Sequence, residues 1–306
     1  MNQSNLKKLQ NLLKEKDIDI FVINRSDEYL NEYISPNAER LNFITNFSGS
    51  AGRAIITPTD AFLYVDGRYT FQANTQINAK EIQAKHLNSF WTDLEKILLE
   101  EEYKIALDPT LHSIIEIEKV EKMLKNSTSQ LQLIDKNFVD LIWENQPKTQ
   151  YTDIFDHPTS FAGQGRSEKL DILKKFLDQN EIDHYFVSGL DNIAWLLNLR
   201  ADDIKYTPLL YSYLLISKNN KHSLYIKESS MPEILKKEIQ TLININNIEN
   251  IGSIFNNINS SESIGLDFNS TTFYFLDLLR KQKINTKNLA NPCILLKAIK
   301  NETELD

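Results

Sequence analysis

Cysteine is almost absent from this sequence. Cys293 is the single cysteine among 306 residues, so the chain cannot form an intrachain disulfide, and this composition fits a reducing compartment. The sequence also lacks an apolar run near the roughly 18 residues that a membrane-spanning helix needs, and its first residues lack the apolar core of a signal peptide. These absences predict a soluble cytoplasmic protein that does not associate with a membrane.

Excess positive charge is absent as well. Lysine and arginine number 34 against 42 aspartates and glutamates, so the formal net charge is −8, and the lysines form no basic block. An acidic chain repels phosphate groups, so the composition argues against binding to nucleic acid or to anionic membranes. The length and the 41% hydrophobic content predict a globular protein of two domains, each able to bury a core.

No self-contained catalytic signature is present. Ser50 directly follows Gly49 and therefore does not form the G-x-S-x-G turn of a nucleophilic serine. Gly163 and Gly165 lack the preceding strand and the third glycine of a dinucleotide-binding loop. The histidines have no metal-ligand spacing and no partner cysteine pair; they are His86, His112, His157, His184 and His222. We therefore expect no catalytic residue, no metal ligand and no bound cofactor in this chain.

Three polar or reactive features receive structural interpretations. His184 lies in an apolar strand pattern and is predicted to be structural. Cys293 has no local signature and is predicted to be a buried, inert thiol. The acidic pair Asp202 and Asp203 is predicted to lie on the solvated surface.

The most informative stretch runs from Phe47 to Tyr69. It opens with small residues at 49–52, where the backbone can turn tightly or approach another chain closely. Residues 53–57 and 61–65 are short apolar runs separated by the turn signal Pro-Thr-Asp, which predicts an antiparallel hairpin. Asp66 follows this hairpin and is predicted to cap a helix that continues from Tyr69.

Arg68 then falls in the first turn of that helix. A cation is disfavoured at this end of a helix dipole, so the arginine is expected to have an anionic partner. The partner is either a carboxylate within the same domain or, alternatively, a group elsewhere or on a substrate. Arg68 is therefore the candidate functional residue of the chain.

Helical and strand patterns alternate along the remaining sequence. In the first half we expect helices at 5–16, 90–102, 113–125 and 137–143, strands at 18–23, 82–85, 104–107 and 131–134, and a polar loop at 24–40. In the second half we expect helices at 170–177, 192–197, 232–240 and 271–281, and strands at 182–187, 209–217, 222–226 and 263–267. Residues 297–306 are expected to lie within a newly begun amphipathic helix.

The second half repeats the opening of the first. An offset of 164 residues superimposes Ile18-Asp19 on Ile182-Asp183 and carries three apolar helix positions, residues 9, 12 and 13, onto apolar positions. Agreement across both a helix and a strand predicts two copies of one α/β unit. The polar, Pro- and Gly-containing stretch 144–167 is predicted to be the interdomain linker, and the alternative is a long ordered loop that packs on both domains.

Several motifs carry a family resemblance. The sequence is similar to the first two domains of the Xaa-Pro aminopeptidases (aminopeptidase P) in their long three-domain form. The resemblance covers essentially the whole chain, through the motifs at residues 32–57, 64–73, 107–109, 137–143, 189–200, 208–213 and 297–304. Gln146, Asn192 and Ala201 depart from the residues that the family often has at these positions, which puts only local contacts in doubt.

The resemblance implies an α/β fold of two tandem creatinase/prolidase N-terminal-like domains, each a mixed sheet flanked by helices. It places the first domain at residues 1–145, the linker at 146–166 and the second domain at 167–299. Residues 300–306 would begin a pita-bread catalytic domain that this chain lacks. In the family that domain holds two divalent metal ions, usually manganese, on Asp, Asp, His, Glu and Glu.

The resemblance also implies a function. The parent enzyme of the family is a homodimeric metallopeptidase that removes the N-terminal residue from peptides with proline in second position. The arginine of the DGRY motif is associated with substrate binding, and this role carries over to Arg68 alone. The expected role of the two domains is to shape the substrate entrance. The alternative is a peptidase-like protein-binding module without catalysis, and the metal-ligand set downstream of residue 306 would distinguish the two.

Overall fold

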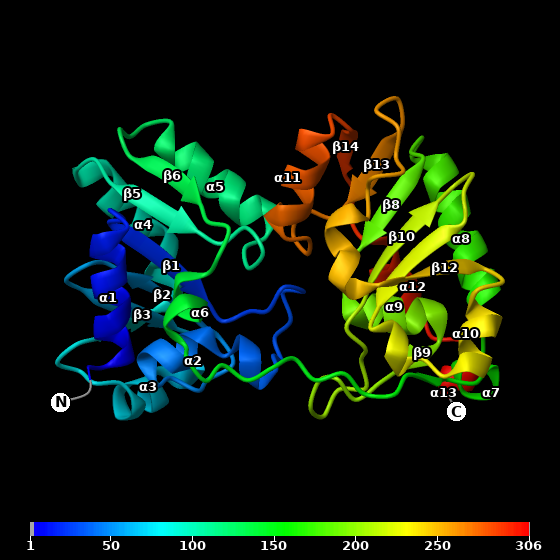
Figure 1. Cartoon of the computed structure of the whole chain (residues 1–306), viewed down its shortest axis with the longest axis horizontal. Coiled ribbons are helices and arrows are strands. Elements are labelled where there is room, and N and C mark those ends of the chain that lie inside the picture. Colours follow the sequence, from blue (N-terminus) through cyan, green and yellow to red (C-terminus); the bar gives the residue numbers. More distant parts are fainter. Residues whose placement is uncertain (1–2, 306) are drawn as a thin grey trace. The chain divides into compact units, whose positions relative to one another are not determined.

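The computed structural model describes residues 3–305 and divides the chain into two compact units, Met1–Thr149 and Gln150–Asp306. Figure 1 shows a twisted sheet with helices around it in each unit. Both units are mixed α/β folds, as the sequence predicts. Within residues 3–305 no helix has both the length and the apolar character needed to cross a membrane.

The first unit is built on a six-stranded sheet, counted over its described residues, with the strand order β4-β3-β2-β1-β5-β6. Its strands are β1 (Ile20–Asn24), β2 (Gly52–Ile56), β3 (Ala61–Val65), β4 (Gln83–His86), β5 (Lys104–Leu107) and β6 (Gln130–Leu133). Its α-helices are α1 (Asn5–Glu15), α2 (Arg40–Thr45), α3 (Thr70–Gln76), α4 (Phe90–Glu100), α5 (Ile114–Leu124) and α6 (Phe138–Ile142). Short 3-10 helices lie at η1 (Pro36–Ala38), η2 (Gly67–Tyr69) and η3 (Leu87–Ser89).

Strand β1 is the centre of this sheet, and all five of its residues are buried. It pairs antiparallel with β2 and parallel with β5, and β2 and β3 form the predicted antiparallel hairpin. Alternate residues of a strand face opposite sides, and Phe21 and Ile23 pack in one core cluster with apolar residues of α1, α2 and α6. Helices α4 and α5 contact each other and contribute no residue to this core cluster. A strand buried on both faces explains why residues 20–23 are continuously apolar.

The second unit has a six-stranded sheet in the order β12-β11-β10-β8-β13-β14 and a two-stranded β7-β9 pair, within the part that the structure describes. Its strands are β7 (Phe155–Asp156), β8 (His184–Val187), β9 (Leu199–Arg200), β10 (Tyr213–Ser217), β11 (His222–Ile226), β12 (Ile243–Asn247), β13 (Ser263–Leu266) and β14 (Asn285–Asn288). Its α-helices are α7 (Thr159–Ala162), α8 (Arg166–Gln179), α9 (Leu190–Leu197), α10 (Glu233–Ile239), α11 (Phe273–Lys281), α12 (Pro292–Ala298) and α13 (Glu302–Leu305). The 3-10 helices are η4 (Glu228–Ser230) and η5 (Ile248–Ser253).

The two units share one topology, which confirms the predicted repeat. Each sheet places the first strand of the repeat at its centre, between an antiparallel and a parallel neighbour. The similarity extends to polar contacts at the ends of the parallel strands. Asp108 accepts a hydrogen bond from Asn137, the N-cap of α6, and Asp267 accepts one from the backbone N–H of Asn291, the N-cap of α12.

Several expected boundaries differ from the observed ones. The expected strand at 209–217 begins only at Tyr213, and the expected helix from residue 297 is divided between α12 and α13, with Asp306 outside the described residues. Strands β12 and β14 carry the polar sequences ININN and NTKN and were not predicted. Both lie at the edges of the sheet, where an apolar pattern is not required.

The predicted linker contains ordered structure. Strand β7 and helix α7 fall within residues 146–166, and both lie in the second unit. The backbone N–H of Ile154 donates to Ser230, and that of His157 donates to Asn198. Residues 147–150 are exposed and carry no secondary structure. The domain and linker boundaries stay a prediction.

Candidate functional site

The candidate site is the turn Asp66–Tyr69, directly after β3. Asp66 is the N-cap of η2, and its Oδ1 accepts a hydrogen bond from the backbone N–H of Arg68 at 3.0 Å. The structure thus has the cap that the sequence predicts, although the first turn is a 3-10 helix and α3 begins at Thr70.

Arg68 pairs with the carboxylate of the same turn. Its Nε donates to Asp66 Oδ1 at 2.8 Å, and this side-chain hydrogen bond lowers the pKa of Asp66 below its ordinary value. The Arg68 side chain is 70% exposed. Among residues 3–305, neither terminal nitrogen of its guanidinium donates a hydrogen bond. The turn therefore holds the guanidinium at Nε and leaves its two Nη groups accessible.

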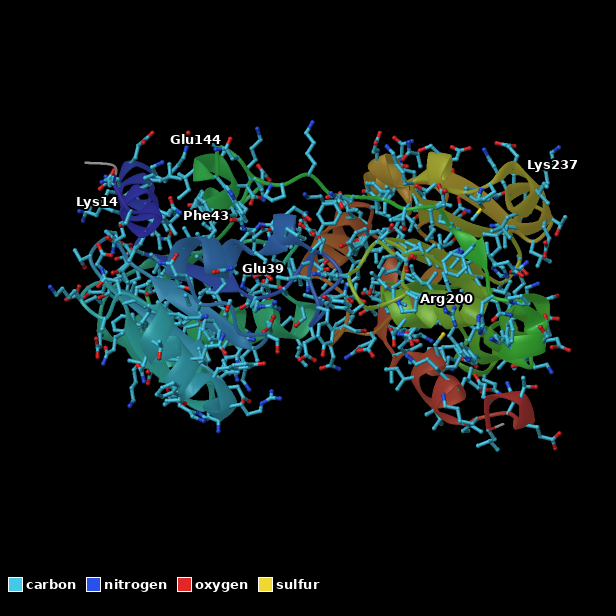
Figure 2. The ribbon with its side chains drawn as sticks, turned by 90° about the horizontal axis from the view of Figure 1, so that it is seen from below. Lys14, Glu39, Phe43, Glu144, Arg200 and Lys237 are labelled. Atoms are coloured by element: carbon cyan, nitrogen blue, oxygen red, sulfur yellow. The ribbon has the colours of Figure 1, made fainter. Side chains whose placement is uncertain are left out.

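The loop before β2 joins this turn through a chain of hydrogen bonds. Tyr69 OH and Ser50 Oγ lie 2.8 Å apart, and Ser50 Oγ donates to Glu32 Oε1 at 3.1 Å. Arg25 donates from Nη1 to the backbone carbonyl of Glu32 and from Nη2 to Glu39 Oε1 at 2.7 and 3.0 Å. Figure 2 labels Glu39, which immediately precedes α2. The Ser50 hydroxyl thus bonds to a tyrosine and a glutamate, and it connects the loop before β2 to the candidate turn.

Gly49 explains the small residues at the start of this stretch. A Cβ atom at Gly49 would lie 2.2 Å from the ring of Phe47, which is itself fully buried in the core. The close approach of loop and ring therefore requires glycine at this position. It fixes the loop that carries Ser50 against the core.

A buried charge network centred on Arg40, the residue after Glu39, was not predicted. Arg40 forms a bidentate pair with Asp140, from Nε at 2.8 Å and from Nη2 at 3.0 Å, and Nη2 also donates to Glu28 at 3.1 Å. The Arg40 side chain is only 7% exposed. Burial alone would lower the pKa of Arg40, but the bonds to Asp140 and Glu28 raise it above its ordinary value. The expected polar loop at 24–40 therefore contains buried, paired charges.

The remaining polar predictions have mixed outcomes. Asp203 is buried and accepts hydrogen bonds from the backbone N–H groups of Thr152 and Tyr211, so the predicted solvated surface is wrong for this residue. Burial raises the pKa of its carboxyl. Cys293 is fully buried, as predicted, and burial raises the pKa of its thiol to about 12. His184 is buried, with Nδ1 at 3.0 Å from Ser217 Oγ, which agrees with its structural interpretation.

The described residues do not provide a metal centre. Within residues 3–305 no group of three or more His, Cys, Asp or Glu side chains converges as a metal-binding set would. Catalytic zinc and magnesium or manganese sites require such convergence of nitrogen or oxygen ligands. The residues present here therefore do not fit a metal ion.

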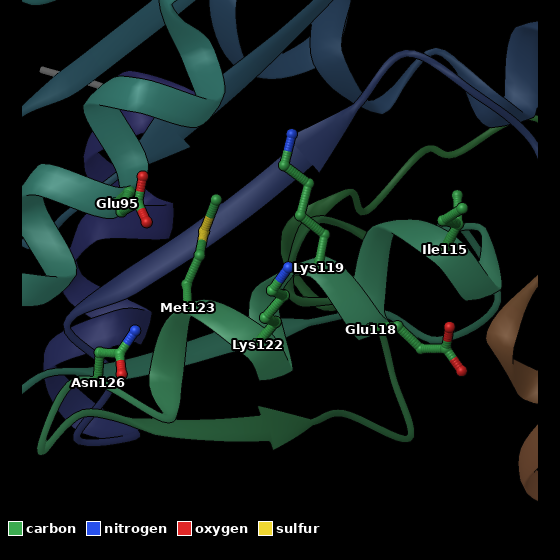
Figure 3. Close-up of a pocket in the computed structure, with 7 residues that line it drawn as sticks. All are labelled: Glu95, Ile115, Glu118, Lys119, Lys122, Met123 and Asn126. Atoms are coloured by element: carbon green, nitrogen blue, oxygen red, sulfur yellow. The ribbon is translucent and has the colours of Figure 1, made fainter.

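The first unit also has a surface hollow of about 510 Å³ between α4 and α5. Figure 3 shows Glu95 of α4 on one side of it and Met123 of α5 on the other. Its lining residues are Glu95, Ile115, Glu118, Lys119, Lys122, Met123 and Asn126. Arg68 does not line this hollow, so the hollow and the candidate turn are different features.

Comparison with known proteins identifies both halves of the chain. Residues 5–136 and residues 145–304 each match a family model described as the creatinase/prolidase N-terminal domain. A probable Xaa-Pro aminopeptidase P from Paracoccidioides brasiliensis (strain Pb03) is 31% identical over 321 residues, covering 98% of this chain and 51% of that protein. One from Neosartorya fischeri is 32% identical over 315 residues, covering 98% and 47%. The chain spans about half the length of these curated relatives.

The fold has a counterpart among solved structures. The crystal structure of X-prolyl aminopeptidase from Caenorhabditis elegans, described as a cytosolic enzyme with a di-nuclear active site, superimposes with a TM-score of 0.89 at 24% identity. The match covers 98% of this chain and 52% of that one. The duplicated topology and the two family-model matches agree, because each match falls on one of the two sheets. This chain therefore belongs to the creatinase/prolidase N-terminal domain family and carries two such domains in tandem.

Proposed function

We propose that this chain is the non-catalytic N-terminal part of a metal-dependent Xaa-Pro aminopeptidase. The parent protein would be a cytoplasmic homodimer that removes the N-terminal residue from peptides with proline second. The observation that carries the proposal is the alignment of 98% of the chain with about half of relatives named Xaa-Pro aminopeptidase P. In the parent, the catalytic domain would follow residue 306.

The side chains of this chain support assigning peptide binding to it and metal binding to another part of the parent. A di-nuclear metal site, as described for the C. elegans enzyme, needs a converging ligand set, and residues 3–305 offer none. We therefore assign the two metal ions, with manganese as the expected metal, to the part of the parent beyond this chain. The residues of this chain would bind and orient the peptide and narrow the entrance to the site.

Arg68 is the proposed substrate contact. Its Nε is held by Asp66, so the guanidinium is oriented before any ligand arrives, and its two Nη groups remain accessible. A pre-oriented guanidinium can donate two parallel hydrogen bonds to a peptide carbonyl or carboxylate. Orienting the substrate in this way reduces the entropy that must be lost when the reacting groups align.

The test compares this chain with its full-length parent. Both proteins are incubated with Mn²⁺ and a fluorogenic Xaa-Pro peptide, with the same peptide carrying alanine in second position as the specificity control. We expect the parent to release the first residue from the proline peptide and this chain to release none. Turnover by this chain that survives repurification would contradict its non-catalytic role.

The protein-binding alternative makes a different prediction for the parent. If the downstream sequence lacks the Asp, Asp, His, Glu and Glu ligands, and the parent is inert with several divalent metals, the chain belongs to a binding protein. Intact ligands together with proline-specific turnover exclude that alternative.

A further inference from the structure

A second buried polar cluster lies at the end of β1, next to the start of α5. Asn24 and Arg53 are paired neighbours on β1 and β2, and both reach Glu116 in the first turn of α5. Arg53 Nη2 donates to Glu116 Oε1 at 2.8 Å, and Asn24 Nδ2 donates to Glu116 Oε2 at 3.5 Å. Glu116 Oε2 also accepts the backbone N–H of Ser113 at 3.2 Å. The Glu116 carboxylate therefore joins two strands to the start of a helix.

His112 completes this cluster. Its backbone directly follows Leu111, whose carbonyl accepts a hydrogen bond from Asn24 Nδ2 at 3.3 Å. The Glu116 carboxylate and the Arg53 guanidinium both act electrostatically on its imidazole ring. Asn24 and Arg53 thus contact the Glu116 carboxylate, and His112 lies within its electrostatic range.

Three polar atoms of the cluster have no hydrogen-bond partner among the described residues: Asn24 Oδ1, Arg53 Nη1 and His112 Nε2. Asn24 is 7% exposed and His112 is 3% exposed. Arg53 is shielded by Phe90 and Trp91, whose ring centroids lie 4.7 and 5.3 Å from its guanidinium carbon. Buried polar atoms without partners are rare, and a group of three points to a ligand that satisfies them.

The hydrogen-bonding role of each atom is fixed by its other contacts. His112 Nδ1 lies 2.8 Å from the carbonyl oxygen of Asp108, which only accepts, so Nδ1 carries the proton. Burial lowers the pKa of His112, so the ring is neutral and Nε2 is an acceptor. Asn24 Nδ2 donates to Leu111, which leaves Oδ1 as an acceptor, and Arg53 Nη1 is a donor. The cluster therefore offers one donor and two acceptors.

We propose that one buried water molecule binds in this cluster, donating to Asn24 Oδ1 and His112 Nε2 and accepting from Arg53 Nη1. A water has two donor hydrogens and readily accepts a third bond, and three hydrogen bonds are typical of buried waters. An anion does not fit because it cannot donate to two acceptors. A metal cation does not fit because the Arg53 guanidinium repels it. This water ties β1, β2 and the start of α5 together.

The proposal is tested directly on the unmodified chain. A high-resolution crystal structure should show one water within about 2.7–3.2 Å of the three atoms. In solution, NMR should show His112 protonated at Nδ1 and its ring protons cross-relaxing with a long-lived water. His112→Phe should remove that water signal, while His184→Phe, at a buried histidine of the second unit, should leave water signals at Asn24 unchanged.

Three results would overturn the proposal. They are a direct hydrogen bond between Arg53 Nη1 and His112 Nε2 in the crystal, density larger than a water, or a His112 ring protonated at Nε2. If His112→Phe does not fold, the measurements on the unmodified chain still decide, because they require no variant.

Discussion

At the residue scale, substitutions of Arg68 distinguish between two roles for this arginine, a contact with substrate and a purely structural ion pair. In the full-length parent, Arg68→Ala should lower kcat/KM roughly tenfold to a hundredfold, because a charge-assisted hydrogen bond to the peptide is lost. If the contact is equally strong in ground and transition states, the change appears mostly in KM. Arg68→Lys should recover only part of the loss, since lysine keeps the charge but not the planar fork. The measurement is steady-state kinetics beside thermal unfolding.

The matched control for Arg68 is Lys104→Ala. Lys104 is also a surface cation of the first unit, paired with Asp17, and nothing connects it with the proposed site. This variant should keep normal kinetics. An Arg68→Ala enzyme that is folded and has unchanged kcat/KM would show that the arginine serves only the fold.

Arg40 is the opposite case, a charge that stabilises the fold. Arg40→Met removes the partner of Asp140 and Glu28 and leaves Asp140 without its bidentate bond. Breaking a buried pair in this way should lower the free energy of unfolding of the first unit by roughly 3 kcal/mol. Urea unfolding measures this loss, again with Lys104→Ala as the exposed control. A loss below about 1 kcal/mol would mean that the network contributes little to stability.

These two arginines also show what the sequence predicts at this scale. Asp66 accepts a hydrogen bond from the backbone N–H of Arg68, only two residues along the chain. Its capping role therefore depends on local spacing and could be predicted from the sequence. Arg40 and Asp140 lie 100 residues apart and meet only because α2 and α6 pack together. Long-range side-chain pairs of this kind have no local signature, so the loop at 24–40 was interpreted as merely polar.

At the element scale, the β10–β11 hairpin carries a titratable contact. The backbone N–H of Ser217 at the end of β10 donates to Nδ1 of His222 at the start of β11, so that nitrogen must remain unprotonated. Burial, together with the positive charge of Lys174, lowers the pKa of His222 from 6.5 to about 4. The negative charge of Asp171 acts in the opposite direction but is the smaller effect. Because the unfolded chain binds the proton more readily, stability is complete above about pH 6.5 and is lost as the pH falls towards 4.

We therefore expect acid to destabilise the second unit through His222 by roughly 3 kcal/mol at pH 4, from a depression of about 2.5 pKa units. The measurement is urea unfolding at several pH values between 7 and 4 for the unmodified chain and for His222→Gln. The variant should show a shallower pH dependence in this window. The exposed His86 provides the control His86→Gln, and equal slopes for all three proteins would contradict the prediction.

Neither edge strand of the second six-stranded sheet was predicted from the sequence, although the edge strands β4 and β6 of the first were. The central strands β1 and β8 are buried along their full length and read clearly as apolar runs. The edge strand β14 (NTKN) has no apolar residue, and β12 (ININN) has apolar side chains only at Ile243 and Ile245; the outer side of each is not covered by another strand. These two strands are defined by their pairing with β11 and β13. A local sequence pattern does not indicate such pairing between distant segments.

At the scale of the whole molecule, we expect the exposed segment at the boundary between the units to be the first site of proteolysis. Lys148 lies in the exposed segment 147–150, whereas Arg166 is 11% exposed and donates to Leu197, Asp156 and Glu238. Trypsin should therefore cut first after Lys148 and leave two resistant pieces, with Arg166 protected. Mass spectrometry of a time course identifies the first cut.

Lys148→Gln is the control for this cut and should delay the appearance of both pieces. First cuts inside Phe47–Tyr69 would contradict the organisation described here. The domain repeat itself was predictable, because a shared spacing of helix and strand survives in the sequence.

The placement of each sheet within a continuous stretch of chain has a consequence for biosynthesis. The strands of the first sheet lie between Ile20 and Leu133, and those of the second six-stranded sheet lie between His184 and Asn288. A ribosome adds about 5–20 residues per second, so the second half needs roughly ten to thirty seconds after the first half is complete. Mixed α/β domains fold faster than this. The first domain therefore has time to fold while the second is still being synthesised. During that time it must stay folded without any contribution from the second domain.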